Sequence, residues 1–149
     1  MEIGEEIKSK FKNSQQKAMI NVRFTSNWMA QKQSNYMVKH DISMAQFNIL
    51  RILRGAKDFL NVNTIKDRMI EKSPNTTRLM DKLIEKELIE RVRCDKDRRV
   101  VYVKIADKGL KLLSVIDADC TFEELILMEN RITSEEAEIL SALLDKIRG

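Results

Sequence analysis

Two short stretches of this 149-residue chain carry side chains suited to contact with a polyanion. The first offers amide, hydroxyl, guanidinium and ammonium groups at Asn75, Thr76, Thr77, Arg78 and Lys82. Guanidinium and amide groups can pair with base edges in the major groove of DNA, whereas a lysine bound to phosphate reads no sequence. The second stretch, 94–99, holds three cations in four residues. An arginine at such a tip can enter a narrow minor groove, where the negative potential is enhanced.

The basic stretch 94–99 lies between two segments with the alternation of β-strands. Ile89–Arg93 and Val100–Ile105 are rich in β-branched residues, and in the second segment apolar residues alternate with Tyr102 and Lys104. This pattern predicts a two-stranded ribbon with the basic stretch at its tip.

Three helices are expected before the ribbon. Ser43 and Gln46 form a capping-box pattern that predicts a helix start at Ser43, and Gly55 is a plausible stop. A short helix is expected over Val62–Glu71 with Asn61 as its cap. The pair Ser73-Pro74 predicts a helix over 74–86, because proline at the first helical position loses no hydrogen bond. Its apolar face is formed by Leu79, Met80, Leu83 and Ile84.

Longer helices are expected on both sides of this unit. Gly4 and Gly55 bracket fifty residues without glycine or proline, and the first helix is predicted to run to about Lys39. Its seven-residue apolar spacing suggests that part of it meets a second chain. One helix is expected over Asp107–Leu127, and Thr133–Glu136 is a capping box that opens a last helix.

Composition and charge exclude several classes of protein. The 104 residues before Ile105 carry 22 basic and 13 acidic residues, and the remainder carries 5 basic and 10 acidic. No stretch approaches 18 uninterrupted apolar residues, which argues against a membrane span. No Cys/His cluster has ligand spacing, and no catalytic motif is present, so neither a metal, a cofactor nor an enzyme is expected. With no secretory signal and two separated cysteines, the expected location is cytoplasmic.

Four motifs in order resemble those of MarR-type transcriptional regulators over nearly the whole chain. They are Ile42–Phe47, Asn75–Leu83, Glu87–Arg91, and Asp97-Arg98-Arg99 with the strand to Ile105. The resemblance implies a mostly α (α+β) fold in one domain, 1–149. Residues 42–106 would form a winged helix-turn-helix, and 1–40 and 107–149 would be dimerisation helices.

The resemblance also implies roles for individual residues. Arg99 matches the wing arginine that enters the minor groove, and Asp97 matches the acid that holds it. Arg98 is expected near phosphate. Asn63 and Thr64, at the start of the short helix, are expected to bind phosphate through backbone N–H groups.

Two departures from the family pattern concern local geometry. Glu87 replaces the usual glycine, which implies that the helix-to-strand turn is built differently. Ala106 replaces a capping threonine, and Asp107 is the alternative cap.

A ligand pocket is implied between the dimerisation helices and the winged helix, with walls from Phe24, Trp28, His40, Met44 and Phe47. Ordinary core packing is the alternative for each of these five. Nearby cations make Cys94 the candidate for thiol sensing, whereas Cys120 is expected to be inert packing.

The leading interpretation is therefore a homodimeric repressor, responsive to a ligand, that binds a pseudo-palindromic operator in double-stranded DNA. The helix 74–86 would read the major groove and the wing 94–99 the minor groove, with half-sites about 10 bp apart. The alternative is a winged-helix protein-interaction module that binds an acidic partner without reading DNA sequence.

Overall fold

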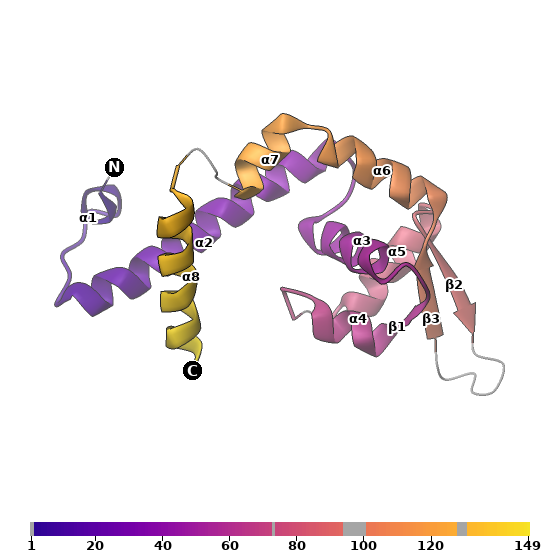
Figure 1. The fold of residues 1–149 in the computed structure, drawn as a ribbon, viewed down its shortest axis with the longest axis horizontal. Coiled ribbons are helices and arrows are strands. Elements are labelled where there is room, and N and C mark those ends of the chain that lie inside the picture. The colour runs from indigo at the N-terminus through magenta and orange to yellow at the C-terminus, as the bar shows by residue number, and fades with distance from the viewer. Residues whose placement is uncertain (1, 73, 94–100, 128–130) are drawn as a thin grey trace.

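The computed structural model describes residues 2–72, 74–93, 101–127 and 131–149. Figure 1 shows two lobes, one built around the long helix α2 and the other around three shorter helices and a small sheet. The described helices are α1 (Ile3–Glu6), α2 (Ser14–Val38), α3 (Met44–Ala56), α4 (Val62–Arg68), α5 (Thr76–Glu85), α6 (Asp107–Asp117), α7 (Cys120–Leu127) and α8 (Ser134–Arg148). No helix among the described residues is long and apolar enough to cross a membrane.

The second lobe is a winged helix-turn-helix, as predicted. Strands β1 (Leu60–Asn61), β2 (Ile89–Arg93) and β3 (Val101–Ile105) form an antiparallel sheet in the order β1-β3-β2. The register pairs Ile89 with Ile105 and Arg93 with Val101. The mostly helical fold with a two-stranded ribbon is thereby confirmed, and the short β1 is an additional edge strand.

A single apolar core holds this lobe together. Ile49, Leu50 and Leu53 from α3 are fully buried, as are Ile65 from α4 and Leu83 from α5. The same core continues to Leu113 and Ile116 of α6. The apolar face predicted for the helix 74–86 therefore points into this core, where Met80 and Leu83 are buried.

Two helix starts follow the predicted capping chemistry. Ser43 accepts a hydrogen bond from the backbone of Gln46, and the Gln46 side chain accepts one from the Ser43 N–H, which is a full capping box. Thr133 and Glu136 form the same box at α8. Such bonds join residues three apart, so the sequence alone suffices to predict them.

Several helix ends differ from the prediction. Helix α5 begins at Thr76, after Asn75, rather than at Pro74. Helix α4 ends at Arg68, short of Glu71. Helix α3 passes through Gly55 and ends before Lys57, which adopts the left-handed conformation (φ 58°).

The helix expected over Asp107–Leu127 is broken into α6 and α7. The break lies at Ala118 and Asp119, and it turns Cys120 to the surface as a free thiol. The expectation that Cys120 is packed in the interior is therefore wrong, because it assumed one continuous apolar stripe. Likewise Ala106, not Asp107, holds the cap position of α6 and makes no side-chain cap bond.

The turn from α5 into β2 has the conformation that glycine favours. Glu87 has φ 61°, the N–H of Leu88 donates to the Leu83 carbonyl, and the N–H of Glu87 donates to the Ile84 carbonyl. These are the two hydrogen bonds of a Schellman turn. The expectation of a differently built turn is therefore wrong, since glutamate is held in the left-handed conformation instead.

Helix α6 approaches this turn closely. The N–H of Ala106 donates to the Leu88 carbonyl oxygen over 3.1 Å, and a Cβ built at Gly109 would lie 2.3 Å from the same oxygen. Gly109 is therefore required for α6 to pack against the base of the ribbon.

Candidate nucleic-acid interface

Helix α5 presents a polar outer face opposite its buried one. Thr76, Met80 and Leu83 are buried, whereas Thr77, Arg78 and Lys82 are exposed. Asn75, the residue at the cap, is also exposed. Four of the five predicted residues of this helix thus lie on one accessible surface.

Thr76 is the exception. Its side chain is 1% exposed, and its hydroxyl lies 3.6 Å from the sulfur of Met69 in a hydrogen bond. A side chain so placed has no access to a DNA base. Thr76 precedes Met80 by four residues and Leu83 by seven, so it lies on the same buried face as these two. Its hydroxyl contacts Met69, the residue that caps α4.

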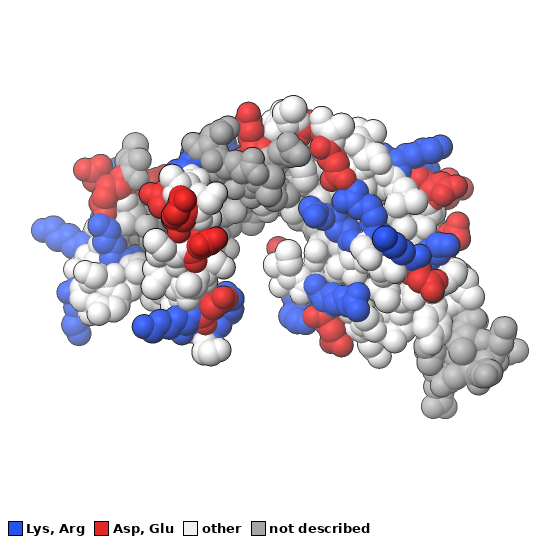
Figure 2. Space-filling model, viewed as in Figure 1, with Lys and Arg blue, Asp and Glu red and all other residues white. Residues whose placement is uncertain are grey.

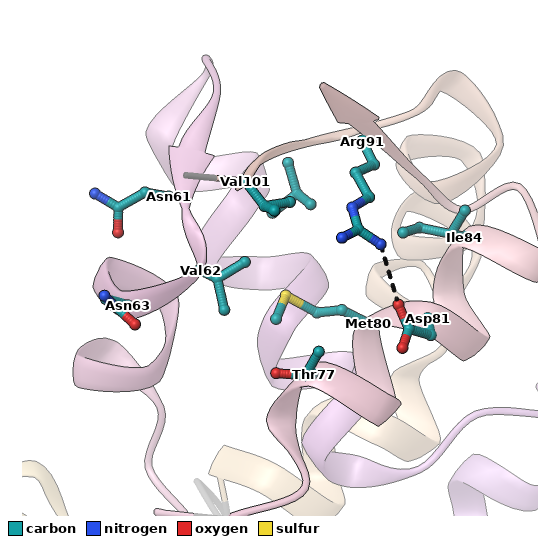
Figure 3. A pocket seen from close by; sticks show the side chains of 10 residues that line it. Asn61, Val62, Asn63, Thr77, Met80, Asp81, Ile84, Arg91 and Val101 are labelled. Atoms are coloured by element: carbon teal, nitrogen blue, oxygen red, sulfur yellow. Dashed lines mark ion pairs between the residues drawn. The ribbon is translucent and has the colours of Figure 1, made fainter. Parts of the chain in front are cut away.

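An ion pair that the sequence did not reveal ties α5 to the sheet. Arg91 of β2 lies 3.6 Å from Asp81, and both line a pocket of about 330 Å³ between α4, α5 and the sheet. Figure 3 shows the Arg91 side chain reaching from its strand toward Asp81, with Thr77 and Asn63 at the same pocket. Asp81 is therefore paired with Arg91, and the structure describes no ion pair between Asp81 and Arg78, three residues earlier on the same helix.

The start of α4 is only partly available. Asn61 accepts hydrogen bonds from the Thr64 N–H (2.8 Å) and from the Thr64 hydroxyl (3.0 Å). Both polar groups of Thr64 are thus engaged within the helix, which contradicts its expected use of the N–H for phosphate. Asn63 is exposed and stays a predicted contact.

The wing is described at its base. Strands β2 and β3 pair along their whole length, which brings Arg93 and Val101 opposite each other. The predicted tip residues Cys94, Asp97, Arg98 and Arg99 lie outside the described residues. Their roles, including thiol sensing at Cys94, stay predictions.

Charge on the visible face is mixed. Figure 2 shows lysine and arginine atoms on the lobe that holds α3, α4 and α5, with acidic groups between them, and further basic groups at the far ends of the other lobe. Several acids that face the winged helix-turn-helix have cationic partners, such as Asp117 with Arg54 and Asp81 with Arg91. This pairing leaves Arg78 and Lys82 as exposed cations on α5 for which the structure describes no ion pair.

The structure describes different surroundings for the five predicted wall residues of the ligand pocket. Phe47 packs edge-on against Phe122 with ring centroids 5.1 Å apart, and the Trp28 ring faces Arg131 at 5.7 Å. Phe24 is half-buried on α2. Met44 lines a pocket of about 90 Å³ whose other residues include none of the remaining four.

His40 is half-buried in surroundings that favour the neutral ring. Its centroid lies 5.3 Å from that of Tyr36, and its Nε2 is buried without a hydrogen-bond partner within the described part of the chain. Burial, and then the nearby Lys39 ammonium, lower the pKa of His40 below its ordinary value. The effector site itself stays a prediction.

Comparison with known proteins agrees with this geometry. Residues 42–101 match the model of the MarR family. The HTH-type transcriptional regulator MhqR of Bacillus subtilis (strain 168) is 30% identical over 114 residues, which cover 76% of this chain and 77% of the relative.

Solved structures give the same result. The MarR transcription factor from Planctomyces limnophilus is 28% identical with a TM-score of 0.68, over 93% of this chain and 98% of that one. The S. aureus MepR–DNA complex is 26% identical with a TM-score of 0.76, over 93% of this chain and 97% of that one. The likeness therefore includes the helices outside the winged helix-turn-helix.

Proposed function

Because the chain belongs to the MarR family of DNA-binding transcriptional regulators, we propose that it acts as a homodimeric repressor of a pseudo-palindromic operator. Each subunit places α5 in the major groove and the wing 94–99 in the adjacent minor groove. The observation that carries this proposal is the exposed polar face of α5, formed by Asn75, Thr77, Arg78 and Lys82 on a buried apolar base.

Dimerisation is supported by the unpartnered apolar face of α8. Ile139, Leu140, Leu143 and Ile147 recur at helical spacing and are between 47% and 61% exposed, and none of the residues of α8 is buried within the chain. Met19 and Val22 of α2 are exposed by 44% and 41%. A soluble protein rarely leaves such a row open, so we assign α1–α2 and α6–α8 to the dimer and 42–106 to DNA binding.

The contacts divide into those that read sequence and those that supply affinity. Arg78 is assigned to a base edge, since arginine to guanine is the commonest specific contact. Lys82 is assigned to phosphate, which contributes affinity and salt dependence. Asn75 and Thr77 flank Arg78 on the same face. In the wing, Arg99 is assigned to the minor groove, Asp97 to its orientation and Arg98 to phosphate.

The test is selection of bound duplexes from a random library by the purified protein, followed by measurement of affinity against salt. A two-fold symmetric consensus with half-sites about 10 bp apart and a steep loss of affinity with salt are expected. Recovery of no consensus at low salt from folded dimer would overturn the proposal. It would favour a winged-helix module for an acidic protein partner.

A further inference from the structure

One lysine, Lys86, joins the C-terminal end of α5 to the end of α2. We infer that Lys86 is a positioning residue, which holds α5 at a fixed angle to α2 through Asp41 and thereby sets the affinity for operator DNA. The inference rests on the proposed DNA-binding function and assigns a role to residues outside the DNA-contacting face.

Lys86 binds two acceptors of a residue 45 positions earlier in the chain. Its Nζ donates to the backbone carbonyl of Asp41 and lies 2.8 Å from Asp41 Oδ2. Lys86 itself caps α5, and its own N–H donates to the Lys82 carbonyl over 3.2 Å. The ammonium therefore connects the last turn of α5 to the segment between α2 and α3.

Asp41 is in turn fixed to α2. Its N–H donates to the Val38 carbonyl over 3.0 Å, and the preceding N–H, of His40, donates to the Met37 carbonyl over 3.0 Å. Asp41 has φ 54°, a left-handed conformation that aspartate tolerates better than most residues. The carbonyl that Lys86 binds is thus part of the closing turn of α2, and it moves with that helix.

Two further contacts complete the support of α5. The Gln46 amide, in the capping box of α3, donates to the Leu79 carbonyl over 3.4 Å, and Arg91 binds Asp81 from the sheet. The sheet and α3 belong to the same lobe as α5. The Lys86–Asp41 contact differs because it reaches the helix around which the other lobe is built.

The contact is too exposed to be explained by stability. The Lys86 side chain is 33% exposed and that of Asp41 is 91% exposed, and ion pairs at the surface contribute little to the free energy of unfolding. A role in orientation needs no large stabilisation, because a small change in the angle of α5 misplaces every base contact at once.

The sign of the Asp41 effect separates positioning from general electrostatics. Removing a negative charge near DNA should strengthen binding if only the field of the protein matters. Under the inference Asp41→Asn weakens binding, because the ionic contact with Lys86 is lost while the backbone carbonyl remains. The loss should be smaller than that of Lys86→Met, which removes both contacts.

The experiment measures the affinity of the full-length protein for its selected duplex, and for a scrambled duplex, as a function of salt. Lys86→Met should lower affinity for the selected duplex roughly three- to thirty-fold, with the salt slope unchanged and with affinity for the scrambled duplex nearly unchanged. Lys86→Arg should retain most of the wild-type affinity for the selected duplex. Lys108→Met is the matched control, since Lys108 forms an exposed pair with Glu87 (3.2 Å) beside the same turn and should leave both affinities unchanged.

Three results would overturn the inference. The first is a weaker salt dependence of Lys86→Met, with the slope of affinity against salt reduced by the contribution of about one phosphate contact. That result would make Lys86 a direct phosphate contact. Another is tighter binding by Asp41→Asn, and the third is an unchanged affinity in Lys86→Met. If Lys86→Met fails to fold, Asp41→Asn and Lys86→Arg decide the question. If the wild-type protein itself selects no duplex, the proposed function fails instead.

Discussion

The hydroxyl of Tyr36 donates a 2.7 Å hydrogen bond to Oδ2 of Asp119, and so joins the end of α2 to the break between α6 and α7. Lys39 donates to the same oxygen over 2.7 Å, and Asp119 Oδ1 accepts from the Thr121 N–H that opens α7. One carboxylate therefore serves as a cap for α7 and as the acceptor that fixes α2 to it. The Lys39 ammonium also lies 3.8 Å from the centroid of the Tyr36 ring.

The first prediction concerns acid stability. The hydrogen bond from Lys39, followed by that from Tyr36, holds the pKa of Asp119 far below its ordinary value. A depressed folded-state pKa contributes stability above the ordinary aspartate pKa of about 3.9, and this stability is lost as pH falls below that value. Thermal melting between about pH 6 and pH 3 should therefore show a smaller loss of Tm in Asp119→Asn than in the wild type. Parallel curves would show that Asp119 contributes no pH dependence.

The second prediction concerns His40, the only histidine. Its lowered pKa means that the fold favours the neutral ring, so this group weakens stability as pH falls through the ordinary histidine value of about 6.5. A proton NMR titration should give one histidine midpoint, below 6.5. The same titration in 6 M guanidinium chloride supplies the reference, and an equal midpoint in both states would contradict the prediction.

The third prediction compares two glycines. Gly109→Ala places a methyl group against the Leu88 carbonyl and should lower the free energy of unfolding by about 1–3 kcal/mol, as overpacking does. Gly55→Ala is the control, because a Cβ there meets no atom within 4 Å and the residue is inside α3. It should stabilise by about 0.5–1 kcal/mol. Urea denaturation of both variants measures the difference, and equal effects would refute it.

The fourth prediction concerns the apolar row of α8. Leu143→Glu places a charge in the proposed dimer interface, so sedimentation should show a monomer and operator affinity should fall at least tenfold. Ile70→Glu is the control for the oligomeric state, because Ile70 is 85% exposed and lies outside the segments assigned to the dimer, so this variant should stay dimeric. If Leu143→Glu stays dimeric, the dimer interface lies on another part of the chain.

The fifth prediction separates the two cations of α5. Arg78→Ala should relax sequence preference and weaken binding to the selected duplex by about 1–3 kcal/mol. Lys82→Ala should weaken binding to all duplexes alike and reduce the salt slope by about one phosphate. Parallel titrations of both variants with selected and scrambled DNA decide between these roles. If Arg78→Ala keeps the wild-type preference, the base contact belongs to another residue.

Whether the sequence predicts an interaction depends on how many positions separate its two residues in the chain. The capping boxes at Ser43 and Thr133 join residues three apart, and the two-stranded ribbon follows from an alternation with a period of two, so both were predictable. The Tyr36–Asp119 bond spans 83 positions and had no local signal. Thr76 was misplaced even though the sequence held the signal for its burial. It lies four residues before Met80 and seven before Leu83, a spacing that puts it on the apolar face of α5.

The contact at Leu88 gives the wing a fixed foundation. The Leu88 carbonyl accepts a hydrogen bond from the Ala106 N–H and packs against Gly109. The residues just before β2 and just after β3 are therefore held together at this carbonyl. Changes in the length or composition of the segment between β2 and β3 lie away from this contact. They need not disturb the packing of the helices at the base of the ribbon. If the proposed function holds, substitutions in the segment 94–100 should therefore change the preferred operator without changing the packing of the helices.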